Sequence, residues 1–69
     1  MVKIEAYNDG EMWCARGLGV DVFTQAETLD ELIVNIREAV SLHFEGEAET
    51  PDILVLSELR ASHAKAAAG

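Results

Sequence analysis

Four acidic residues, Asp9, Glu11, Asp21 and Glu38, are the first candidates for chemistry in this chain. Carboxylates that converge on one point can hold two Mg²⁺ ions and activate water for nucleic-acid cleavage. Asp9, however, is explained by a turn, and Glu11 lies where a strand is expected to begin. Neither lies in the middle of a strand that would support converging ligands. We therefore interpret the four as solvated surface charge and expect no metal, no cofactor and no catalytic residue.

Three further residues could do chemistry. Cys14 is the single cysteine, so an internal disulfide and a Cys-based zinc site are excluded. It follows Trp13 in an expected strand with no base beside it, which favours a small apolar filler over a nucleophile. His43 has no His or Cys at metal-binding spacing and is expected to edge the core near a helix end. His63 also lacks an identifiable partner, and we expect it to be exposed.

Length and charge limit the kind of protein this can be. A chain of 69 residues, 49% of them apolar, can form one small domain, and without disulfides we expect self-association to support it. Thirteen acidic against five basic residues give a formal charge of −8. Such a charge repels nucleic acid and attracts basic partners. The start Met1-Val2-Lys3-Ile4-Glu5 does not resemble a signal peptide, and no apolar run could span a membrane, so we expect a cytoplasmic protein.

The first half of the sequence predicts three antiparallel strands. Val2, Ile4 and Ala6 alternate with polar residues, and Asn8-Asp9-Gly10 then predicts a hairpin turn. The second strand is expected over 12–16 and includes Trp13, whose ring would be the largest contributor to the core. Gly17-Leu18-Gly19 should end it, and the third strand is expected over 20–25.

The second half predicts a helix and a last strand. Thr28-Leu29-Asp30-Glu31 matches a capping box, and Gly46 is a candidate helix C-cap. An apolar arc on the helix should face the sheet; it comprises Leu29, Leu32, Ile33, Ile36, Ala39, Val40 and Phe44. Ile53-Leu54-Val55-Leu56 is a continuous apolar run, typical of a strand that is central or covered on both faces.

These elements predict an α+β fold with the order β-β-β-α-β. A right-handed crossover should place the last strand beside the first and parallel to the third. The expected result is one mostly antiparallel sheet covered on one face by a single helix. We expect this domain over 1–59 and an Ala-rich tail, flexible or a short helix, over 60–69.

Several of these motifs also resemble the HicB-like antitoxin family, whose pattern runs D-G-x-(Y/W)-x-A, then G-x-x-T-x-G-x-T-x-x-E, then N-x-x-E-A. The residues that carry the resemblance are Asp9-Gly10, Trp13, Ala15, Thr24, Thr28-Leu29-Asp30-Glu31, Asn35 and Glu38-Ala39. They cover about two thirds of the chain. The family's Leu-Pro-Gly segment is reduced to Gly17-Leu18-Gly19, and Ala26 replaces a usual glycine.

The resemblance implies a trimmed ribonuclease H-like fold and the function of a type II antitoxin. Such a protein neutralises a small basic ribonuclease toxin by covering its active surface, and the charge of −8 suits that partner. Many family members add a DNA-binding segment, for which this chain is too short. The alternative is a stand-alone homo-oligomer, a homodimer or homotetramer, with a structural role or an unidentified ligand. Neither interpretation makes the chain an enzyme or a direct nucleic-acid or membrane binder.

Candidate contact residues lie on the helix side opposite the apolar arc. Val34 and Leu42 are apolar where a monomer would normally carry polar residues. Glu38 and Glu45 lie near them in the sequence. We predict that these four residues contact a partner or another copy of the chain.

Overall fold

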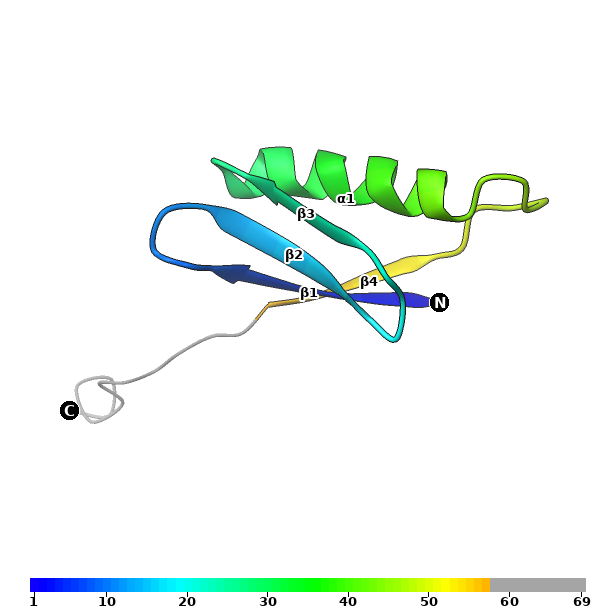
Figure 1. The fold of residues 1–69 in the computed structure, drawn as a ribbon, viewed down its shortest axis with the longest axis horizontal. Helices are drawn as coiled ribbons and strands as arrows, with labels where there is room; N and C mark the ends of the chain where they lie inside the picture. The colour runs from blue at the N-terminus through cyan, green and yellow to red at the C-terminus, as the bar shows by residue number, and fades with distance from the viewer. Residues whose placement is uncertain (58–69) are drawn as a thin grey trace.

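The computed structural model describes residues 1–57 (Figure 1). The predicted domain boundary after residue 59, the segment 60–69 and His63 lie outside the described residues. The elements are β1 (Val2–Asn8), β2 (Trp13–Leu18), β3 (Phe23–Ala26), α1 (Leu29–His43) and β4 (Ile53–Ser57). This is the predicted β-β-β-α-β order.

The strands form one mixed sheet in the order β3-β2-β1-β4. β1 pairs antiparallel with β2, and β2 antiparallel with β3. After the helix, β4 returns to pair parallel with β1, with Ile4 opposite Val55. The α+β class and the position of the last strand beside the first are therefore confirmed. Figure 1 shows the helix along one side of the sheet, with β4 as the edge strand far from β3.

The hairpin between β1 and β2 forms at the predicted turn. The Asn8 side chain accepts a hydrogen bond from the Gly10 amide at 2.8 Å. Asp9 Oδ1 accepts from the amides of Glu11 and Met12 at 2.9 and 2.8 Å. Gly10 has a φ of +106°, which an L side chain rarely adopts. The turn thus satisfies its own backbone with the two side chains that the sequence places there.

The connection from β2 to β3 lies later in the sequence than predicted. β2 continues through Gly17 to Leu18, and β3 begins at Phe23, later than predicted. The Gly17 amide donates to the Val22 carbonyl at 2.7 Å. A Cβ at Gly17 would collide with the carbonyl oxygen and side chain of Val20. Gly17 is therefore required for close packing and does not end the strand.

The helix begins at the predicted cap. Thr28 Oγ1 accepts a hydrogen bond from the Glu31 amide at 3.1 Å, and the Thr28 carbonyl accepts from the Leu32 amide at 3.0 Å. The helix ends at His43, before Gly46, whose φ of +97° belongs to the turn that follows. Within residues 1–57, no helix has the length and apolar character needed to cross a membrane.

The core lies between the helix and the sheet. Its fully buried large side chains are Ile4, Leu32, Ile36 and Val40. The helix packs chiefly on β3 and next on β2. Trp13 is only half-buried against the margin of the core, so the core depends on aliphatic side chains more than the sequence suggested.

The prediction of a central or fully covered last strand is wrong. β4 lies at the edge of the sheet, and none of its residues is buried. Leu54 and Leu56 remain 39% and 41% exposed. An apolar run alone cannot distinguish a strand covered within its own chain from one left open.

Candidate protein-binding surfaces

The four predicted contact residues form one surface on the helix. Val34, Glu38 and Leu42 follow each other at four-residue intervals in α1, so they lie along one side of it, and Glu45 is in the turn just after its end. We call these four residues the helix stripe. Val34 is 51% exposed and Leu42 is 70% exposed, while Glu38 and Glu45 are also exposed. The structure therefore brings together all four residues.

The helix stripe lies within a strongly acidic segment. Residues 27 to 49 include seven exposed carboxylates. Arg37 is the one Lys or Arg in the same segment. The carboxylates are Glu27, Asp30, Glu31, Glu38, Glu45, Glu47 and Glu49. We call this exposed segment the acidic helix side. It combines a negative field with two exposed apolar side chains, which suits contact with a basic protein.

One end of the helix stripe opens into a shallow hollow of about 360 Å³. Leu42 lines it together with Phe23, which is largely exposed, and with Asp21 and His43. The imidazole of His43 contacts the Phe44 ring edge-on, with centroids 4.9 Å apart. His43 is exposed and does not edge the core as predicted. The hollow extends the apolar contact area of the helix stripe toward β3.

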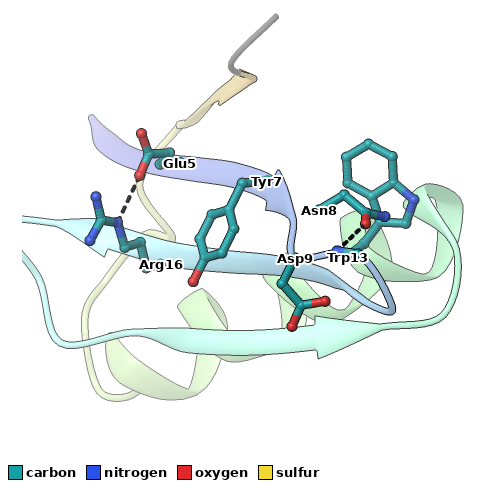
Figure 2. Close-up of a pocket in the computed structure, with 7 residues that line it drawn as sticks. Glu5, Tyr7, Asn8, Asp9, Trp13 and Arg16 are labelled. Carbon is teal, nitrogen blue, oxygen red and sulfur yellow. Dashed lines mark hydrogen bonds and ion pairs between the residues drawn. The ribbon is translucent and has the colours of Figure 1, made fainter. Parts of the chain in front are cut away.

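The sheet face opposite the helix has a different charge. Strand alternation places Lys3, Glu5, Arg16, Leu54 and Leu56 on this face, opposite to the buried side chains of Val2, Ile4, Ala6 and Ala15. We call it the open sheet face. Arg16 Nε lies 2.7 Å from Glu5 Oε1, so this carboxylate is paired (Figure 2). The face is therefore not negative, although the chain carries a charge of −8.

A larger hollow of about 760 Å³ lies on the open sheet face near the hairpin. Its lining, shown in Figure 2, consists of Glu5, Tyr7, Asn8, Asp9, Gly10, Trp13 and Arg16. Its charged groups are already engaged: Glu5 with Arg16, and Asp9 with backbone amides. The sequence did not reveal this hollow, because it joins β1, the hairpin and β2 across the sheet. Alternation of side chains could group only Glu5, Tyr7 and Arg16, because it assigns Asn8 and Trp13 to the other face.

Asp9 and Cys14 meet at the hairpin end of the sheet. The amides of Met12 and Glu11 hold the pKa of the Asp9 carboxyl below its ordinary value, because they stabilise its charged form. The Cys14 sulfur lies 3.7 Å from Asp9 Oδ2. Burial, and next the negative charge of Asp9, raise the pKa of the Cys14 thiol. Both effects disfavour a thiolate, so the geometry is unsuited to a nucleophile.

The four carboxylates first considered as metal ligands belong to three different parts of the fold. Asp9 and Glu11 are in the hairpin, Asp21 is between β2 and β3, and Glu38 is on the outer side of α1. Among residues 1–57, no three or more His, Cys, Asp or Glu side chains gather closely enough to hold a metal ion. The hydrogen bonds of Asp9 show that its carboxylate has a structural role in the turn.

In residues 1–57 the fold and these surfaces define a small α+β protein with one helix, an acidic helix side and an open sheet face that is not acidic. No family model and no solved structure matches the chain. The UPF0150 protein of Archaeoglobus fulgidus is 44% identical to it over 50 residues, which cover 72% of this chain and 71% of that protein. The chain belongs to the UPF0150 family.

Proposed function

We propose that this chain is a HicB-like antitoxin module that neutralises a small basic ribonuclease toxin by covering its active surface. Its membership of the UPF0150 family is compatible with the HicB-like resemblance of its motifs. In this proposal the chain acts by binding and carries no catalytic group of its own.

The observation that carries the proposal is the uneven distribution of charge. Seven exposed carboxylates lie between residues 27 and 49, while the open sheet face combines Lys3 with the paired Glu5 and Arg16. A basic protein is therefore drawn to the helix side and not to the sheet.

Val34 and Leu42 would supply the apolar part of that contact. Charged residues steer a partner and exclude wrong ones, but desolvated apolar side chains hold a complex together. Leu42 is 70% exposed and lines the hollow beside Phe23, so an incoming side chain can bury both. We place the toxin contact on the helix stripe for this reason.

The experiment is a ribonuclease inhibition titration. The probe is the toxin-sized basic protein encoded beside this chain, produced separately and assayed for RNA cleavage. We expect cleavage to stop near an equimolar amount of this chain, and Leu42→Asp to need at least about ten times more. Absence of such a neighbouring gene, or undiminished cleavage with an excess of the folded chain, would refute the proposal.

A second candidate is a stand-alone homo-oligomer without a toxin. The exposed apolar residues of β4 favour it, because they indicate a contact that needs no basic protein. In that case the chain would assemble by itself, and a thermal-shift screen would find small-molecule ligands but no stabilisation by any basic protein.

A further inference from the structure

β4 has the apolar composition of a buried strand, yet it lies at the edge of the sheet. Ile53 and Val55 face the helix side and are half-buried, while Leu54 and Leu56 lie on the open sheet face. A five-residue strand with four large apolar side chains is thus accessible on both faces. Covering these partly exposed side chains would remove further apolar surface from water, so covering the strand is favourable.

The backbone of β4 is equally open. Among residues 1–57 its single neighbour in the sheet is β1, so no other strand in this part of the chain pairs with the amide and carbonyl groups on its outer edge. Native edge strands are usually protected by a charge, a proline or a bulge, yet Ile53–Ser57 contains neither a charged residue nor a proline. Pro51 lies before the strand, so it removes no backbone amide from the edge of β4.

The opposite edge of the sheet differs. β3 has only four residues and lies beneath the helix, and Asn35 Nδ2 donates to the Gln25 carbonyl at 3.2 Å. Among residues 1–57, no side chain makes a comparable hydrogen bond to the backbone of β4. Residues 1–57 therefore protect one edge of the sheet and leave the other available.

Charge decides which occupant suits this edge. β4 is uncharged, and its open-face neighbours in β1 are Lys3 and Glu5, the latter paired with Arg16. This edge offers a basic toxin fewer carboxylates than the acidic helix side does, and two copies of the chain can meet here while their acidic helix sides stay apart.

We infer that two copies of this chain associate through β4, pairing antiparallel about a twofold axis to form one continuous eight-stranded sheet. An isologous contact of this kind joins identical strands and uses the free backbone groups of both. Ile53 and Val55 of each copy then extend the two cores, and Leu54 and Leu56 form one apolar band on the open sheet face. This inference is independent of the proposed toxin.

The test uses the full chain alone, without any basic protein. Light scattering after gel filtration should give twice the chain mass, and the melting temperature should rise with protein concentration. Hydrogen exchange followed by NMR should show slow exchange for alternate β4 amides, those that point away from β1.

Variants separate this edge from the other exposed apolar residues. Leu54→Lys with Leu56→Lys should give the monomer mass with unchanged circular dichroism, because both side chains lie outside the core. Two controls should remain dimeric. Leu18→Lys alters a residue that is 40% exposed on β2, and Leu42→Asp alters the helix stripe.

Three results would overturn the inference. One is a wild-type chain that is monomeric up to near-millimolar concentration. This result would count against the inference whether the β4 amides exchange rapidly or are protected by residues 58–69 of the same chain. Another is a dimer that survives the double lysine substitution. The third is a dimer that dissociates with Leu42→Asp but not with the β4 variant. If the double variant fails to fold, the wild-type mass and the exchange of its β4 amides still decide the question.

Discussion

Arg16 Nε lies 2.7 Å from Glu5 Oε1, across directly opposed positions of β2 and β1. The pair neutralises the carboxylate that β1 presents on the open sheet face. The negative charge of the chain is consequently concentrated on the acidic helix side, where no comparable number of cations offsets it. Exposed ion pairs contribute little to folding stability, so the importance of this one lies in the distribution of charge. The two faces of one small domain are thereby suited to different partners.

Thr28→Ala should lower the free energy of unfolding by about 1 kcal/mol, because Thr28 Oγ1 caps the helix through the Glu31 amide. Urea denaturation followed by circular dichroism measures the change. Thr50→Ala is the matched control, since Thr50 is exposed in the loop before β4. Equal losses from the two variants would show that the cap contributes nothing measurable.

Gly17→Ala should destabilise the fold by about 1–3 kcal/mol, because the new methyl group would collide with Val20. Gly46→Ala is the control: it strains a positive φ, but a Cβ there meets open space. We expect Gly46→Ala to cost less, on the order of 1 kcal/mol. Denaturation midpoints of both variants test the order, and a smaller loss for Gly17→Ala would contradict the proposed close contact.

The hairpin should make stability depend on acid pH through Asp9. Its pKa is lower in the folded chain than the ordinary value of 3.8, so its stabilising contribution is complete above that pH. The contribution is lost as pH falls below 3.8 through the depressed folded value. Thermal melts of wild type and Asp9→Asn should therefore converge as pH falls through this range. Melts that stay apart down to the lowest pH would contradict a stabilising role of the Asp9 carboxylate.

The sequence was most informative where structure is local. Asn8, Asp9 and Thr28 satisfy backbone groups two or three residues away, so their spacing predicted the turn and the helix start correctly. The exposed positions of Val34 and Leu42 followed from the helical period in the same way.

Features that join distant segments were not predictable to the same extent. The contact between Gly17 and Val20 depends on the path of a tight connection, and the Glu5–Arg16 pair depends on strand register. The prediction that β4 is central or covered on both faces was wrong because an apolar run indicates burial but does not show whether the same chain or another copy covers the strand. The contact roles of Glu38 and Glu45 stay predictions, since exposure alone does not identify a partner.

The central claim is that the acidic helix side binds the basic partner. It is tested by exchanging single charges and measuring affinity for the neighbouring toxin-sized protein by titration calorimetry. Glu38 and Glu11 are both exposed glutamates, so Glu38→Arg and Glu11→Arg change the net charge equally. We predict that Glu38→Arg weakens binding at least about tenfold while Glu11→Arg changes it far less. Equal weakening by the two substitutions would mean that net charge alone attracts the partner, and would contradict a binding surface on the helix.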